Sequence, residues 1–303
     1  MEQRTATRAA LFALVVASIL WGTTGTAASF LPAAVSPLAI GASTMGVGGL
    51  LLFVFSAPSS MAALRDPVAR RWLLLGSLGV FVYPLAFYSA MSEAGVAIGN
   101  VVALGSGPIF AAVFEWLWER HRLSARWAVC AGTAIVGIAL LSTGRVTTPA
   151  ESANVPFGLA LGLLAGLAYA LYTYASSRAL AAAHSGRAVM GGMFGIGAVL
   201  LAPVLLVTGA PLLASAHTVA IASYLAIGPM FLAYLLFGFA LRAIRSSVAT
   251  TVTLIEPFVA TLLAVLVVGE VLQWSGWAGL CLIVLGVTLQ FSARQPGNST
   301  TSF

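Results

Sequence analysis

The sequence predicts an all-α membrane protein with ten transmembrane helices, arranged as two inverted five-helix repeats with both termini in the cytoplasm. Three observations lead to this fold class: the apolar composition, the similarity between the two halves of the chain, and the placement of arginine. Of the 303 residues, 60% are hydrophobic and 7% are charged, whereas about a quarter of the residues of a soluble domain are charged. The mean hydropathy is +1.02. This composition indicates a chain that lies in lipid.

Ten apolar stretches, separated by charged or polar residues, define the predicted spans. A helix needs about 20 mostly apolar residues to cross the hydrocarbon, and a transmembrane β-barrel would instead show alternating segments of about 10 residues. The first stretch follows Arg4 and Arg8 as a signal peptide would, but its counterpart lies in mid-chain, so we expect it to be retained. The spans are 9–29, 37–57, 72–92, 96–116, 125–143, 156–177, 187–207, 219–240, 246–268 and 274–292.

The second half of the chain repeats the first with a slowly increasing offset. Uncommon residues recur in the same order, as Met45 and Met193, Pro108 and Pro257, Glu119 and Glu270, and Cys130 and Cys281. We predict a first repeat over 1–143, an outside linker over 144–155, a second repeat over 156–294 and a disordered cytoplasmic tail over 295–303. An odd number of spans in each repeat inverts the second copy, and inverted repeats are typical of transporters that bind substrate near the membrane midplane.

Arginine placement predicts the orientation. Cytoplasmic loops of membrane proteins carry an excess of positive charge. With a cytoplasmic N-terminus, thirteen of the 14 basic residues fall in predicted inside loops, and only Arg145 falls outside. The net charge of +6 therefore reflects membrane topology, and we predict no nucleic-acid partner. The predicted partners are a small-molecule substrate and membrane lipid. The oligomeric state stays open, with a monomer plausible.

The motifs of several other protein classes are missing from the sequence. It has no P-loop, no G-x-S-x-G and no H-E-x-x-H motif, which argues against an ATP-driven pump or a membrane protease. His121, His184 and His217 all fall in predicted loops, and the two cysteines lie inside spans of opposite halves. We therefore expect no metal site, no cofactor and no enzymatic activity.

Aromatic side chains occur at a similar predicted depth on the first, third, sixth and eighth spans, which would face each other across the pseudo-twofold axis. Together with the polar Asn100 on the fourth span, they predict an aromatic-lined cavity. For each residue taken alone, ordinary helix packing is the alternative. The candidate substrate-binding residues are Trp21, Tyr83, Phe87, Asn100, Tyr169, Tyr172, Phe231 and Tyr234.

Glu256 is the only charged residue near the centre of a predicted span. Burying a carboxylate at that depth costs about 3 kcal/mol, so such a residue is usually neutralised or functional. Two interpretations stay open: a protonated glutamate bonded to a carbonyl that Pro257 frees, or a site for a proton or a substrate amine. The counterpart of Glu256 in the first repeat is the uncharged Gly107. Prolines within spans predict helix breaks or hinges, namely Pro84, Pro108, Pro229 and Pro257.

Several of these residues resemble the motifs of a known superfamily. They are Trp21-Gly22, the stretch from Pro108 to Glu119 before a glycine-rich fifth span, and the stretch from Glu256-Pro257 to Glu270, with Gly286 in the tenth span. Over nearly the whole of 9–292 the chain resembles the drug/metabolite transporter superfamily, in particular bacterial members with two EamA-type halves. It is most similar to the aromatic amino acid exporter branch.

The resemblance implies ten helices, export from the cytoplasm and a central cavity between inverted halves. The leading interpretation is an inner-membrane exporter of neutral amphipathic metabolites, with aromatic or hydrophobic amino acids first. One alternative is an exporter of drugs or other metabolites on the same scaffold. A more remote one is a non-transporting membrane enzyme or assembly partner.

Overall fold

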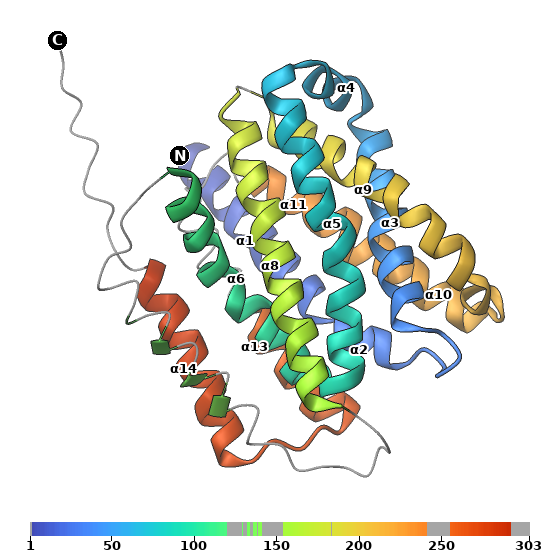
Figure 1. The fold of residues 1–303 in the computed structure, drawn as a ribbon, viewed down its shortest axis with the longest axis vertical. Coiled ribbons are helices and arrows are strands. Elements are labelled where there is room, and N and C mark those ends of the chain that lie inside the picture. Colours follow the sequence, from blue (N-terminus) through green and yellow to red (C-terminus); the bar gives the residue numbers. More distant parts are fainter. Residues whose placement is uncertain are drawn as a thin grey trace.

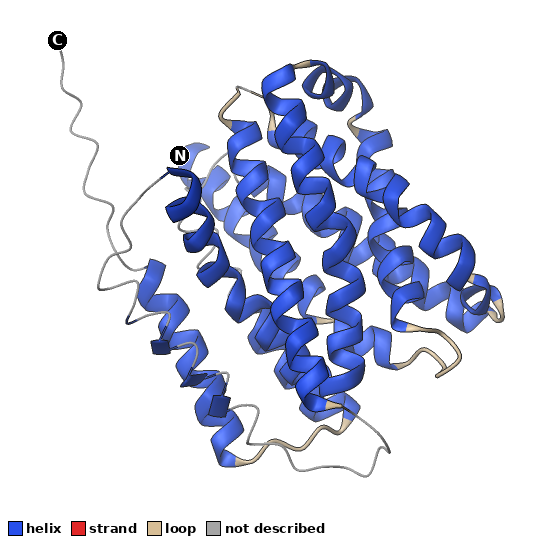
Figure 2. Ribbon diagram, viewed as in Figure 1, coloured by secondary structure: helices blue, strands red, loops and turns tan. Residues whose placement is uncertain are grey.

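A computed structural model describes residues 2–119, 154–182, 184–240 and 255–291, together with a few residues between 129 and 140. Helices make up the regular structure of this part of the chain (Figure 2). Seven of the described helical segments are long and apolar enough to cross a membrane, and two shorter apolar helices lie near the C-terminal end. Most of the predicted span 125–143, the start of the span 246–268, most of the linker and the tail lie outside the described residues.

The helices pack side by side as a bundle (Figure 1). In chain order they are α1 (Glu2–Gly22), α2 (Thr24–Ser29), α3 (Pro37–Phe55), α4 (Ala57–Arg65), α5 (Pro67–Ala94), α6 (Val96–Glu119), α8 (Val155–Leu180), α9 (Gly186–Thr208), η1 (Ala210–Leu213), α10 (Ala216–Leu225), η2 (Ala226–Leu232), α11 (Ala233–Ala240), α13 (Ile255–Leu263), η3 (Ala264–Val268) and α14 (Trp274–Phe291).

Three predicted spans depart from regular α-helix within the described residues. The ninth does so at η3, a π-helical segment. The first has a single turn residue at Thr23, through which the backbone hydrogen bonds of the helix continue. The Thr23 hydroxyl donates to the carbonyl of Leu20 at 2.7 Å and lies 2.7 Å from the hydroxyl of Tyr224. The eighth contains η2, a π-helical segment around Pro229. Proline has no N–H to donate to the helix, and π-helical turns are rare features that occur often at functional sites. The short helix α4 was not predicted.

Several helices begin at residues that suit an N-cap. The side chains of Ser36, Asp66, Asn154 and Ser185 each accept a hydrogen bond from a backbone N–H two or three residues further on. Each thereby satisfies one of the N–H groups that a helix start leaves without a partner. Proline follows in the first turn of α3, α5 and α8, where its missing N–H costs nothing. These caps fix where the membrane helices begin.

The second membrane span of each repeat, α3 in the first and α9 in the second, packs against its counterpart, and the two helices run in opposite directions. A Cβ at Gly49 of α3 would lie 2.7 Å from the carbonyl oxygen of Phe194 of α9, and a Cβ at Gly191 would meet the Ser56 hydroxyl. Along α3, Gly49 precedes Ser56, whereas along α9 Gly191 precedes Phe194. The pair is therefore antiparallel, as expected of inverted repeats.

Helices of the two repeats are intermixed. From the second repeat, α8 packs against α5 and α6 of the first, while α1 of the first packs against α11 and α13 of the second. Contact between α5 and α8 is close, since a Cβ at Gly79 would lie 2.6 Å from the carbonyl oxygen of Ala168. On the outer surface of the bundle, apolar side chains such as Leu206 and Val207 of α9 are 84% and 83% exposed, which suits contact with lipid.

Candidate functional site

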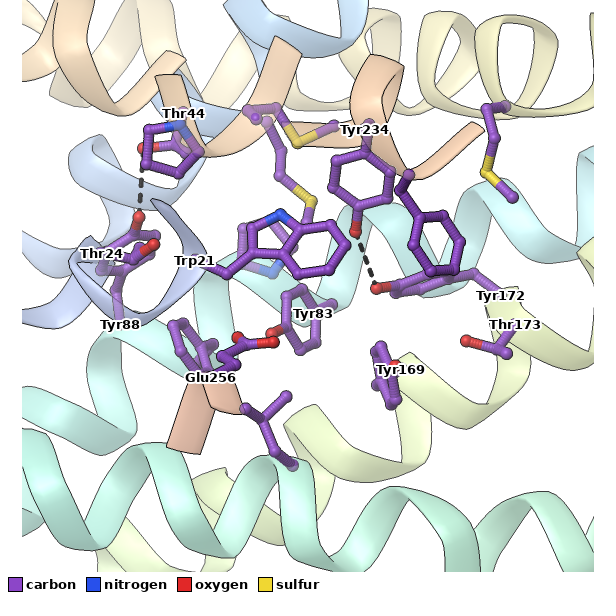
Figure 3. A pocket seen from close by; sticks show the side chains of 18 of the residues that line it. Trp21, Thr24, Thr44, Tyr83, Tyr88, Tyr169, Tyr172, Thr173, Tyr234 and Glu256 are labelled. Carbon is purple, nitrogen blue, oxygen red and sulfur yellow. Dashed lines mark hydrogen bonds between the residues drawn. The ribbon is translucent and has the colours of Figure 1, made fainter. Parts of the chain in front are cut away.

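A central cavity of about 170 Å³ lies between the α5–α6–α8 group and the α1–α11–α13 group (Figure 3). Both repeats contribute to its wall. The lining comes from the ends of α1 and α2, the middle of α3, α5 and α8, part of α6 and α9, and from η2, α11 and α13. The cavity therefore lies at the interface between the repeats.

Aromatic side chains of α5 and α8, which were among the predicted candidates, contact one another in the cavity wall. The ring of Tyr83 lies 5.2 Å from Phe87, 5.9 Å from Tyr169 and 5.8 Å from Tyr172, measured between centroids. Tyr169 and Tyr172 are perpendicular at 5.3 Å. Separations of about 4.5–7 Å with tilted or perpendicular planes are the favourable geometry of aromatic pairs. These rings form one continuous aromatic surface on the α5–α8 side of the cavity.

On the other side, Trp21 packs edge-on against Tyr234 at 5.3 Å and lies 5.6 Å from Phe237. The hydroxyls of Tyr172 and Tyr234 are 3.2 Å apart, which links α8 to α11 by a hydrogen bond across the cavity. Tyr88 donates to the Thr44 hydroxyl at 3.3 Å, and both bonds are drawn in Figure 3. Within the described part of the chain, the indole Nε1 of Trp21 is buried and has no hydrogen-bond partner.

Glu256 extends from α13 into this aromatic wall (Figure 3). It is the one charged side chain among the described residues that line the cavity. The opposite position in the first repeat has no room for a similar group, because a Cβ at Gly107 would lie 2.7 Å from Cδ1 of Tyr169. Among the described lining residues, the second repeat therefore contributes a carboxylate to the cavity and the first repeat does not.

Two of the predicted hinge prolines, Pro84 and Pro229, also line the cavity. Pro84 lies inside the uninterrupted helix α5, whereas Pro229 lies inside the π-helical segment η2. The backbones of Pro108 and Pro257 belong to α6 and α13. The local helix geometry thus departs from α-helical at only one of the two cavity prolines.

Two of the candidate substrate-binding residues are not brought to the cavity. Phe231 packs against Phe55 of α3, with ring centroids 5.9 Å apart. Asn100 is fully buried in α6 and is absent from the lining, whereas Leu104, one turn further along α6, belongs to it. A side chain one position or one turn away from a lining residue faces a different neighbour, and the sequence alone gave no signal for that difference.

The structure adds lining residues that were not among the candidates. They include hydroxyl and thioether side chains of α3 and α9, two helices that were not predicted to reach the cavity. The full additional set is Thr24, Thr44, Met45, Tyr88, Leu104, Thr173, Ser176, Met190, Met230 and Phe237. Tyr88 and Phe237 could have been found from their spacing to Pro84 and Tyr234 on the same helices.

Polar contacts join the repeats near both ends of the bundle. At one end, Asp66 accepts a hydrogen bond at 2.9 Å from Nε2 of His184, and this bond is the main cause that lowers the pKa of Asp66. At the other end, the carboxylate of Glu270 accepts hydrogen bonds from the backbone N–H groups of Val96 and Ala97. We call this second interaction the Glu270 contact.

Glycines with a positive φ flank the Glu270 contact. Gly95, with φ of +92°, immediately precedes α6, and Gly269, with φ of +80°, immediately precedes Glu270. A Cβ at Gly95 would also lie 3.0 Å from the carboxylate oxygen Oε1 of Glu270. Because residues with a Cβ rarely adopt such φ values, both positions favour glycine. The carboxylate thereby reaches the start of α6, where the helix dipole favours a negative charge.

Two repeats of membrane-length helices around a shared aromatic cavity define a multi-pass membrane protein of the transporter class. The model of the EamA-like transporter family matches the chain twice, over residues 8–143 and 156–292. The chain belongs to the EamA-like transporter family.

Individual relatives agree with this assignment. An uncharacterized transporter of Bacillus subtilis, YwfM, is 32% identical over 283 residues, which is 90% of each chain. The uncharacterized inner membrane transporter YicL of Salmonella typhimurium is 25% identical over 93% of this chain and 95% of its own. One solved crystal structure is similar in fold, with a TM-score of 0.65 at 21% identity over 93% of this chain and 96% of the other.

The comparisons support a membrane transporter without naming a substrate. Both relatives are called uncharacterized transporters, so they give no support to the narrower resemblance to the aromatic amino acid exporter branch. The coarser resemblance, to transporters with two EamA-type halves, is confirmed.

Proposed function

We propose that the protein exports small amphipathic metabolites that carry an amino group, with aromatic and hydrophobic amino acids as the leading candidates. The observation that carries the proposal is the cavity between the repeats, whose described wall combines aromatic rings with a single carboxylate, that of Glu256. Export would take place across the bacterial inner membrane. The name of the YicL relative, which includes the inner membrane, supports that location.

The chemistry of the wall suits such a substrate. The rings of Tyr83, Tyr169 and Trp21 offer faces on which an aromatic or aliphatic body can stack. A substrate ammonium would find both the carboxylate of Glu256 and the negative faces of these rings, which attract cations within about 6 Å. The buried indole N–H of Trp21 has no protein partner among the described residues, so it could donate to a substrate oxygen after a small rotation.

The arrangement of helices supports alternating access as the mechanism. We infer ten transmembrane helices in two inverted repeats, with both termini in the cytoplasm, as the arginine pattern predicts. A cavity between inverted halves can open to one side and then to the other if the halves exchange conformations. In this scheme Pro229 and the π-helical turn around it supply a place where the eighth span can bend.

A drug exporter on the same scaffold is the second candidate. Cavities for drug-sized ligands have volumes of about 300–1,000 Å³, and the volume here is about 170 Å³. In this conformation the cavity therefore favours a small metabolite over a drug. The remote alternative, an enzyme or assembly partner, receives no support from relatives that are named as transporters.

Flux measurements with purified protein in liposomes test the proposal. We expect saturable transport of labelled phenylalanine, tryptophan or leucine, and a strong reduction in the Glu256→Gln variant. Glu93→Gln is the matched control, because Glu93 lies away from the cavity and accepts a hydrogen bond from the backbone N–H of Asn154. Flux of other solutes without flux of any amino acid would refute the substrate assignment.

A further inference from the structure

Three buried polar side chains in the described part of the chain have polar atoms without a hydrogen-bond partner and do not line the cavity. They are Thr26 on α2, Asn100 on α6 and Thr261 on α13. Asn100 and Thr261 are 0% exposed and Thr26 is 6% exposed. For Asn100, neither the oxygen nor the nitrogen of the amide has a partner. Such groups lose their bonds to water without replacement, so burying them costs free energy.

Other buried hydroxyls in the same structure do not behave in this way. Ser18 donates to the carbonyl oxygen of Leu14 at 2.8 Å, and Ser176 donates to that of Tyr172 at 2.7 Å. Bonding back to the preceding helical turn is the usual solution for serine and threonine in apolar surroundings. Thr26 and Thr261 could use the same solution but do not, which marks their environment as different.

The three helices that carry these side chains pack against one another in pairs. At Gly25 of α2, an added Cβ would lie 2.9 Å from the sulfur of Met91 and would meet the side chain of Val96. The first turn of α6 is therefore pressed directly against α2. No space remains between them in this conformation.

Asn100 and Thr261 lie along α6 and α13 between the cavity and the Glu270 contact, while Thr26 lies on α2 two residues beyond the cavity residue Thr24 and also faces a second hollow between α2 and α10. Asn100 lies one turn, or about 6 Å at 1.5 Å per residue, from Val96 in the Glu270 contact, and one turn from Leu104 in the cavity wall. On α13 the chain runs from the cavity residue Glu256 through Thr261 towards Glu270. On the first span it runs from the cavity residue Thr24 to Thr26.

We propose that Thr26, Asn100 and Thr261 line the closed half of the transport path, through which a polar substrate passes between the cavity and the membrane face at which Glu270 lies. The seam between α2, α6 and α13 opens in the alternate state, and water then reaches the three side chains. The partnerless groups lower the stability of the closed seam, while the Glu270 contact raises it. The inference rests on the proposed transport between the two faces, but not on the identity of the substrate.

Cysteine accessibility in full-length protein in liposomes tests this path. In a background without the natural cysteines (C130A/C281A), Thr26→Cys, Asn100→Cys and Thr261→Cys are exposed to a membrane-impermeant methanethiosulfonate reagent on the side at which Glu270 lies. We expect modification of all three, about tenfold faster when Glu270→Gln is added. Val101→Cys is the matched control, because Val101 is equally buried next to Asn100 but packs with Leu280 and Ile283. It should stay unmodified.

Labelling of the three positions no faster than Val101→Cys, with and without Glu270→Gln, would overturn the proposal. If a cysteine variant does not fold, Asn100→Leu and Thr261→Val provide a second test. Removing partnerless polar groups should favour the closed seam, so labelling of the cavity position Thr24→Cys from the Glu270 side should slow about tenfold. An unchanged or faster rate would also overturn it. Path labelling without amino acid flux would refute only the proposed substrate, and flux without path labelling would refute only the path.

Discussion

Replacing Glu270 by glutamine should shift the protein towards a state that is open at the Glu270 end. The carboxylate accepts one backbone hydrogen bond with each oxygen, and hydrogen bonds to charged groups contribute about 1.5–3 kcal/mol each. Glutamine keeps one acceptor oxygen but loses the charge and places an NH₂ group against a backbone N–H. A loss of about 2 kcal/mol is therefore expected, which changes the ratio of open to closed states about 30-fold at 1.4 kcal/mol per factor of ten.

The assay is the rate at which an impermeant thiol reagent, added on the Glu270 side, modifies Thr24→Cys in the cysteine-free background. Thr24 lines the cavity, so from that side it becomes accessible only when the seam opens. Glu270→Gln should raise this rate at least about tenfold, whereas Glu93→Gln, a carboxylate with a single exposed hydrogen bond, should leave it unchanged. Equal rates in the Glu270→Gln variant and the parent protein would show that the Glu270 contact does not hold the seam closed.

Three further outcomes are expected. Trp21→Ala should reduce substrate flux at least about tenfold in folded protein, because it removes one of the aromatic side chains that line the cavity. Flux equal to that of the control Trp274→Ala, a residue that is 89% exposed, would show that Trp21 contributes only to packing. Gly79→Leu should lower thermal stability by several degrees, because its side chain would enter the contact between α5 and α8; an unaltered melting curve would contradict that packing. Asp66→Asn should lower the melting temperature at neutral pH. Because the folded-state pKa of Asp66 lies below its ordinary value of 3.8, the difference between variant and parent should be complete above pH 3.8 and should disappear as the pH falls below it.

Most of the membrane helices could be predicted from the sequence, because long apolar stretches between charged residues have few other structures open to them. The predicted spans 37–57, 72–92 and 96–116 coincide closely with α3, α5 and α6. Interruptions inside spans were harder to foresee. The turn at Thr23 coincides with a contact to Tyr224, 201 residues away in the sequence, and no local pattern encodes such a contact.

The candidate site was predictable in its chemistry and less so in its detail. Aromatic residues at a common depth, together with Glu256, were brought to one cavity as expected. Phe231 was not, because it is the neighbour of Met230, and adjacent residues on a helix point in different directions. Within η2 and α11, Met230 and Tyr234 line the cavity while Phe231 meets Phe55.

The contributions of α3 and α9 were missed altogether. Both helices are uniformly apolar and rich in glycine, and nothing in that pattern distinguishes a wall residue such as Thr44 or Met190 from packing. Their position in the wall follows from how the two repeats dock on each other, which the sequence of either helix does not specify.

The intermixing of α8 with α5 and α6, and of α1 with α11 and α13, has a consequence for the origin of this architecture. A single ancestral copy would have supplied only part of this wall, from the counterparts of α1, α3, α5 and α6, so it could not have formed a complete wall alone. Such a copy would have worked only as an antiparallel pair, with each subunit lending its first helix to its neighbour. Gene fusion would then have freed the two copies to diverge, and the presence of a carboxylate at Glu256 but of a hydrogen at Gly107 is the kind of difference that identical subunits could never have maintained.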